Sequence, residues 1–139
     1  MTKHVDGLLD DYFYNRWNAT SAPSAGATCS ASSGRGVGSG NANAMPTLSR
    51  NILEAIVFSI LNRTAAATTA TLEIREASIG GSVLASVDII TAASATSADC
   101  YSQYYQYATR GNDISVSFNT VQASVTQKIN ISGWTEQSR

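Results

Sequence analysis

The segment Ile52–Leu61 (ILEAIVFSIL) is the most densely apolar stretch of the 139-residue chain. It is too short to cross a bilayer as a helix, but its length suits a buried β-strand. β-Branched and aromatic side chains such as Val57, Phe58 and Ile60 pack well on a pleated surface. Both alternating faces are largely apolar, with Glu54 as the charged exception. We therefore predict a strand covered on both faces, one by the core of its own domain and the other by a neighbouring chain or the N-terminal arm. A short buried helix is the competing interpretation.

Further strands are expected after this segment. Residues 69–76 alternate between apolar and polar side chains, which is typical of a half-buried antiparallel strand. Gly80 and Gly81 then supply the backbone freedom of a tight turn. The other expected strands are residues 83–90, 99–108, 113–119 and 125–134. No helical pattern separates them, so a parallel βαβ sheet is not expected. Residues 48–139 are thus predicted to form an all-β domain, an antiparallel sandwich or jelly-roll-like domain of about six to eight strands.

Residues 1–47 are predicted to be an extended N-terminal arm. Apolar residues between positions 5 and 17 recur at spacings of three and four, which predicts one short amphipathic helix. Residues 18–47 are rich in Ser, Gly and Ala and are expected to be a linker. Because so short a helix is marginal alone in water, its apolar face should dock either on its own domain or on another subunit. The residues expected to contact such a partner are Leu8, Leu9, Tyr12, Phe13 and Trp17.

Charge and composition exclude several classes of partner. Nine basic and ten acidic residues give a net charge of −1, and they form no basic patch of the kind that binds nucleic acid. No apolar leader follows Met1 and no run is long enough for a membrane-spanning helix, so neither a signal peptide nor a membrane is expected. Cys29 and Cys100 lie far apart in the sequence, and two separate thiols are expected rather than a disulfide.

The sequence lacks the residue groupings that catalysis or a cofactor would need. The single histidine, His4, and two distant cysteines do not have zinc-ligand spacing, and no Ser-His-Asp arrangement is plausible with His4 beside the terminus. The alternating glycines from Gly34 to Gly40 do not match a nucleotide-binding loop. We therefore expect no enzyme activity, no metal and no cofactor.

A tyrosine cluster is the most distinctive group of side chains. Tyr101, Tyr104, Tyr105 and Tyr107 fall within one expected strand. Tyrosine is favoured where one end of a side chain is dry and the other wet. The cluster could serve sheet packing, a subunit interface or stacking on sugar rings, and we take its four tyrosines as candidate partner-binding residues.

Two segments resemble small virion proteins of tailed bacteriophages: residues 56–75 (IVFSILNRTAAATTATLEIR) and 80–87 (GGSVLASV). In those proteins an apolar strand, Asn-x-Thr-Ala, a Thr-rich strand, a Gly turn and a Val-Leu-Ala strand recur in all-β domains. The similarity covers about residues 52–90, and the tyrosine cluster replaces the usual Gly-rich segment near the fifth strand.

The resemblance implies a non-enzymatic structural protein located in the virion, most simply a capsid cement or decoration protein that stabilises the shell. Its partners would be the major capsid protein or other virion subunits, and the chain would form a homo-oligomer. The alternatives are a tail-fibre or receptor-binding component and a head–tail connector component. No catalytic residue carries over from the resemblance.

Overall fold

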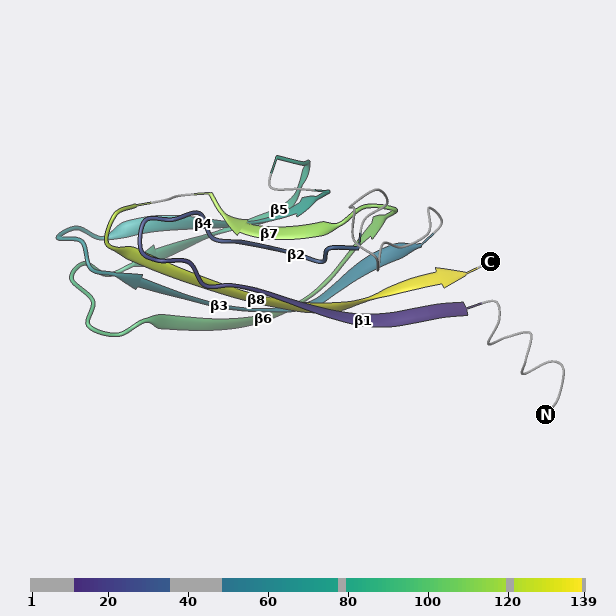
Figure 1. The fold of residues 1–139 in the computed structure, drawn as a ribbon. Helices are drawn as coiled ribbons and strands as arrows, with labels where there is room; N and C mark the ends of the chain where they lie inside the picture. The colour runs from purple at the N-terminus through teal and green to yellow at the C-terminus, as the bar shows by residue number, and fades with distance from the viewer. Residues whose placement is uncertain (1–11, 36–48, 78–79, 120–121, 139) are drawn as a thin grey trace, which may run out of the picture.

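The computed structural model describes residues 12–35, 49–77, 80–119 and 122–138, which form eight strands in two antiparallel sheets (Figure 1). We call the sheets A and B. Sheet A has the order β1 (Tyr12–Ser21), β8 (Val125–Ser138), β3 (Arg50–Asn62) and β6 (Asp99–Arg110). Sheet B has the order β2 (Ser30–Ser32), β7 (Ile114–Phe118), β4 (Thr68–Glu76) and β5 (Val83–Thr91). The described residues contain no helix. The prediction of an all-β, antiparallel two-sheet fold is confirmed.

The strand pairs follow a simple rule along the chain. β1 pairs with β8, β2 with β7, β3 with β6 and β4 with β5, so the first half of the chain pairs with the second half in reverse order. The additional pairs β3–β8 and β4–β7 join these ribbons into the two sheets. The chain is therefore a long antiparallel hairpin rolled into two layers. The start of β1 and the end of β8 lie side by side in Figure 1.

The core lies between the two sheets and is centred on β3. Ile56, Phe58 and Ile60 alternate along the inner face of β3, and each is at most 2% exposed. The ring of Phe58 meets Phe118 of sheet B edge-on at a centroid distance of 5.9 Å. On its other side it stacks on Tyr101 of β6 at 5.1 Å. The predicted strand Ile52–Leu61 is thus central in its sheet, with one face in the core.

The N-terminal helix predicted over residues 5–17 is wrong where the structure describes the chain. Residues 12–21 form β1, which pairs with β8 from Tyr12↔Ser138 to Ser21↔Ile129. The apolar residues at helical spacing also fit a strand once an edge of the sheet is available, because pairing and burial override local pattern. Leu8 and Leu9 lie outside the described residues, and the side chains of Tyr12 and Phe13 are not described.

The predicted linker also contributes to the sandwich. β2 lies inside residues 18–47 and pairs with β7 from Ser30↔Ser117 to Ser32↔Ser115. The described part of the chain before residue 48 therefore supplies one strand to each sheet.

A buried polar network fastens the segment after β2 to both sheets. The Asn51 side chain is fully buried and donates from Nδ2 to Ser33 Oγ at 3.2 Å and to the Asn112 carbonyl at 2.9 Å. Its Oδ1 accepts a hydrogen bond from Thr135 Oγ1 at 2.6 Å. Ser33 Oγ in turn donates to Asp113 Oδ1 at 3.0 Å. These bonds join residues up to 84 positions apart, so they specify the tertiary pairing rather than a local turn.

Candidate binding site

The outer face of sheet A carries two rows of neighbouring side chains near the start of β1 and the end of β8. Residues directly opposite each other in antiparallel strands point to the same face of the sheet. Trp17, Gly133 and Leu53 pair across the sheet and face the core, so the residues next to them face outward. The first outward row is Arg16, Trp134, Ile52 and Ala108. The second contains Glu136, Arg50 and Arg110.

Bulges beside these rows set the position of Glu54. Between Leu53 and Ala55, β3 has one residue more than β8, namely Glu54. At the same place β6 has two residues, between Tyr104 and Tyr107, opposite Glu54. Such extra residues bend a sheet and redirect side chains, often next to binding sites. Here Glu54 Oε2 reaches Arg16 Nη1 at 3.0 Å, across the intervening strand β8.

Glu136 organises the second row. Its side chain is only 10% exposed, and its carboxylate accepts hydrogen bonds from Trp134 Nε1 at 3.0 Å and from Arg50 Nε. Arg50 is also ion-paired with Glu136, while 58% of the Arg50 side chain remains exposed. Charge-assisted hydrogen bonds of this kind hold both partners in fixed positions. Glu136 therefore fixes the indole of Trp134 and the guanidinium of Arg50 beside each other.

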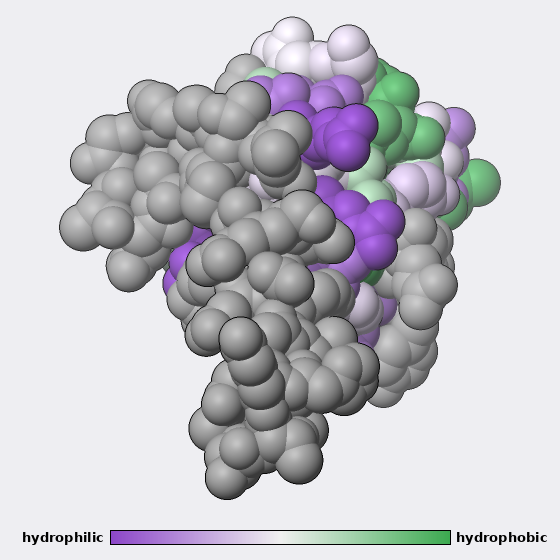
Figure 2. All heavy atoms as spheres, turned by 90° about the vertical axis from the view of Figure 1, so that its right-hand side faces the viewer, coloured by the Kyte–Doolittle hydropathy of each residue, from purple (hydrophilic) through white to green (hydrophobic). Residues whose placement is uncertain are grey.

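A hollow of about 350 Å³ opens between these rows. It is lined by Arg50, Ile52, Ala108, Trp134 and Glu136. Its lining combines an indole ring and aliphatic groups with a paired guanidinium and carboxylate. In Figure 2, which views the end of the sandwich where β1 begins and β8 ends, hydrophilic residues gather in the middle of the visible described surface and apolar residues lie to one side.

A second hollow of about 260 Å³ lies at the other end of the same face. Its lining is almost entirely apolar or neutral and includes Val57, Ser59 and Cys100, with Lys128 as the charged member. Val57 is 51% exposed, which is unusual for a valine in a central strand, and the thiol of Cys100 is free and exposed.

Small neutral side chains connect the two hollows. They come from the three neighbouring strands β1, β8 and β3 and are uncharged. These side chains are Asn18, Ser132 and Ala55 in one row and Thr20, Asn130 and Val57 in the next. A partner can approach such a surface closely, because there is little charge to desolvate.

Metal-binding groups, the buried thiol and membrane-spanning helices can also be checked in the described part of the chain. Among them, no group of three or more His, Cys, Asp or Glu side chains could hold a metal ion. Burial raises the pKa of the Cys29 thiol, and its hydrogen bonds offset this only in part, so the group is a protonated core residue and not an activated nucleophile. Over the same residues, no helix is long and apolar enough to cross a membrane.

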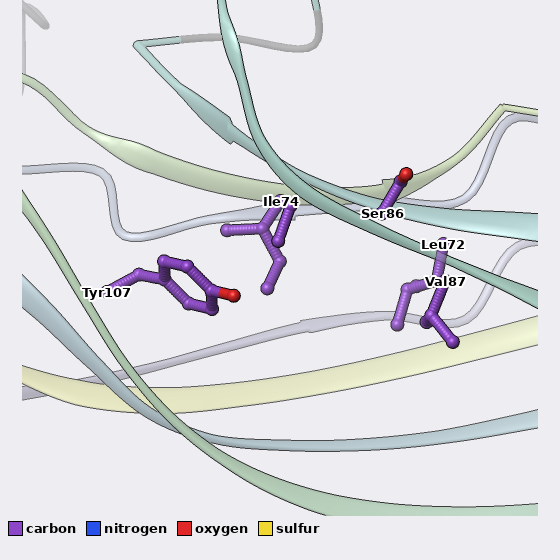
Figure 3. Close-up of a pocket in the computed structure, with 6 residues that line it drawn as sticks. Leu72, Ile74, Ser86, Val87 and Tyr107 are labelled. Carbon is purple, nitrogen blue, oxygen red and sulfur yellow. The ribbon is translucent and has the colours of Figure 1, made fainter.

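Two of the four candidate tyrosines have described side chains, and both face the interior of the sandwich. Tyr101 is half-buried against Phe58, inside the sandwich. Tyr107 is also half-buried and points between the sheets, where it lines a cavity of about 80 Å³ with residues of β4 and β5 such as Ile74 (Figure 3). Tyr104 is the pairing partner of Ala55, and the side chains of Tyr104 and Tyr105 are not described.

Trp134 lies on the outer face, while Trp17 packs in the core and is 7% exposed. Sequence reasoning did not select Trp134, Arg50 or Glu136. Arg50 and Glu136 are 86 positions apart, and only the register of β3 against β8 brings them together. The one local signal was the outward position of Trp134 in a strand that alternates Ile129, Ile131 and Gly133 on its inner face.

Comparison with known proteins adds little to this geometry. No family model matches the chain, and no curated protein matches it. One solved structure that matches weakly is a family 11 carbohydrate-binding module from Clostridium thermocellum, in complex with a β-1,3-1,4-mixed-linked tetrasaccharide. The two chains are 12% identical over 92% of this chain and 89% of that chain, with a TM-score of 0.31. At this TM-score the likeness identifies neither a family nor a ligand.

Proposed function

We propose that the protein is a non-enzymatic structural protein of a tailed-phage virion, a cement protein that binds neighbouring subunits of the shell through the outer face of sheet A. Its partners are the major capsid protein or other virion subunits, and it acts as a homo-oligomer. The protein belongs to the virion and not to a membrane or to nucleic acid.

The strand order supports a jelly-roll assignment. Pairing of the first strand with the last, the second with the seventh, and so on inward is the wrapping of an eight-stranded jelly roll. Jelly rolls recur in viral capsid and lectin domains. The resemblance of residues 52–90 to phage virion proteins points in the same direction. Because a fold does not determine a function, the proposal depends on the site.

The outer face of sheet A is the observation that carries the proposal. Tryptophan and arginine dominate the binding energy of many protein interfaces, and Trp134 and Arg50 lie side by side there, fixed by Glu136. A neutral surface with exposed Val57 continues from them along the sheet. A pre-positioned aromatic and arginine pair beside a flat neutral surface suits a protein partner, because little ordering is required on binding.

Virion composition tests this proposal. We expect the protein to co-purify with intact particles of the phage that encodes it, in on the order of hundreds of copies, as symmetric decoration of a shell requires. About a dozen copies or fewer would indicate a connector instead. Trp134→Ala should weaken binding of the purified protein to particles that lack it, whereas Arg63→Glu, at an exposed residue just after β3, should not. Absence from particles would refute the proposal.

A second candidate is a tail component that binds glycans. The hollow beside Trp134 combines a ring face with the polar groups of Arg50 and Glu136, and sugars bind to such combinations of stacking and hydrogen bonding. A glycan array separates the two candidates. Saturable binding of an oligosaccharide that is lost in Trp134→Ala would favour the tail component.

A further inference from the structure

Strand β5 forms one edge of sheet B. It stands last in the order β2-β7-β4-β5, and within the described chain it pairs with β4 alone. The strand is nine residues long and contains no lysine, arginine or proline. Its register against β4 is irregular at one place, near its start, where Leu84 is the extra residue. A long strand at an edge can accept a further strand, because half of its backbone N–H and C=O groups point away from the sheet.

The other edge strands of the described sheets are better protected against such pairing. β2 has only three residues. β6 is bulged in its middle, opposite Glu54. β1 carries the charged Arg16. Short length, bulges and charged side chains are the devices that keep sheet edges from pairing. Among these edges, β5 is therefore the one best suited to strand addition.

The side chains of β5 favour burial of this edge. Ile90 is 74% exposed and Val83 is 47% exposed. A single exposed apolar residue is common, but these two lie on the same edge strand. The one charged residue of the strand, Asp88, accepts a hydrogen bond from Thr71 Oγ1 of β4 at 2.6 Å. This bond draws the carboxylate over the sheet and away from the edge where a further strand would pair.

The strand is complementary to a reversed copy of itself. In an antiparallel pair with a two-fold axis at Val87, this valine faces its own copy and no carboxylate faces another carboxylate. An axis at Asp88 would instead place two aspartates directly opposite each other, which is destabilising. With the axis at Val87, the other opposed pairs are Ser86 with Asp88, the small Ala85 with the larger Ile89, and Leu84 with Ile90. Ser86 and Val87 point to opposite sides of the strand in Figure 3, as this alternation requires.

We infer that β5 of one molecule pairs with β5 of a second copy, antiparallel and about a two-fold axis at Val87. The pairing joins two four-stranded sheets into one continuous sheet. Because both molecules use the same surface, the contact closes as a dimer. The outer face of sheet A takes no part in it. The inference therefore goes beyond the proposed function and adds the surface through which the homo-oligomer forms.

A charge introduced at the edge tests the pairing. Ile90→Lys changes a side chain that is already exposed, and it should lower the self-association constant, measured by sedimentation velocity, by at least about tenfold. The reason is that each ammonium group would be held against apolar side chains of the partner strand. Ala27→Lys adds the same charge at an exposed position between β1 and β2, the edge strands on the opposite side of the two sheets. This control should associate like the original protein, and circular dichroism should show both variants folded.

Disulfide trapping tests the register. Cys100 is exposed and is first replaced by serine, whereas Cys29 is buried and can stay. In this background, an equimolar mixture of Ser86→Cys and Asp88→Cys should give a disulfide-linked dimer on mild oxidation. Directly opposed residues of antiparallel strands lie about 4.5–5.5 Å apart between Cα atoms, which a disulfide can bridge. Each variant alone should stay unlinked, because each new thiol then faces a residue without sulfur.

Several results would overturn the inference. They are a monomeric original protein at every concentration, undiminished association of Ile90→Lys, an equal loss in Ala27→Lys, and equal cross-linking of the mixture and the single variants. Because self-association is measured without particles, this inference and the proposed function can fail separately. A monomer that still binds particles would leave the function standing, and a dimer that is absent from particles would leave the inference standing.

Discussion

Replacement of Gly133 by alanine tests how the bulged region beside the candidate binding site is built. A Cβ atom at position 133 would lie 2.0 Å from the carbonyl oxygen of Ile52 and 2.6 Å from Cζ2 of Trp17. Ordinary van der Waals contact begins at 3.4 Å. The Trp17 ring could shift, but the Ile52 oxygen belongs to the backbone of the neighbouring strand β3. The added methyl group must therefore push β3 away from β8 at the bulge.

The expected cost follows from that displacement. Overpacking of a core typically costs about 1–3 kcal/mol, and a lost ladder hydrogen bond adds about 1 kcal/mol. We therefore expect Gly133→Ala to lower the free energy of unfolding by about 3 kcal/mol, out of a total of about 5–15 kcal/mol for a domain of this size. In urea denaturation this loss of stability appears as a lower midpoint concentration, with little change in the dependence of the unfolding free energy on urea. The same displacement would disturb the neighbouring Glu54.

Two further variants locate the obstruction. Ser132→Ala, at the adjacent outward position, should change stability by no more than about 0.5 kcal/mol. Trp17→Ala should not rescue Gly133→Ala, since it removes the ring but leaves the Ile52 oxygen in place. A loss below about 1 kcal/mol for Gly133→Ala, or recovery of most of the loss in the double variant, would refute the reasoning.

Other predictions concern the core and surface. Asn51→Ala should cost about 2–4 kcal/mol in denaturant unfolding, because it leaves several buried polar partners unsatisfied; a cost below about 1 kcal/mol would contradict this. Ellman's reagent should modify Cys100 in the folded protein but Cys29 only after unfolding. Burial raises the pKa of the Cys29 thiol, so on raising the pH the thiol ionises in the unfolded chain before it does so in the folded protein. Its contribution to stability is therefore intact below the ordinary thiol pKa and is lost as the pH rises through the folded-state pKa. Cys29→Ser should remove this loss of stability at alkaline pH. Arg16→Ala should cost no more than about 1 kcal/mol, since its ion pair with Glu54 is exposed; a larger loss would show that the pair supports the bulge.

Local sequence pattern was enough to locate these strands. The apolar run from Ile52 and the alternating residues from Thr69 both became strands at nearly the expected bounds, because apolar density and a period of two are properties of the segment itself. The N-terminal strand β1 was misread as a helix for the opposite reason. Its apolar residues also fit helical spacing, and its partner β8 begins more than a hundred residues later.

The candidate binding face could not be predicted in the same way. Arg50 and Glu136 are ordinary charged residues in their own segments, and neither predicts a site alone. Their ion pair and the neighbouring position of Arg110 depend on the register between three strands, whereas the hydrogen bond from Trp134 to Glu136 lies within β8.

The sequence by itself determined that this chain forms antiparallel strands, which of them pass through the core, and that no zinc or nucleotide motif is present. Only the tertiary structure decided that residues 12–21 form an edge strand of sheet A, that Tyr101 and Tyr107 face the interior of the sandwich, and that Trp134 and two arginines share an outer face. The physical reason is that side-chain alternation is local, whereas strand register is set by pairing between distant segments, and one step in register moves every side chain to the opposite face.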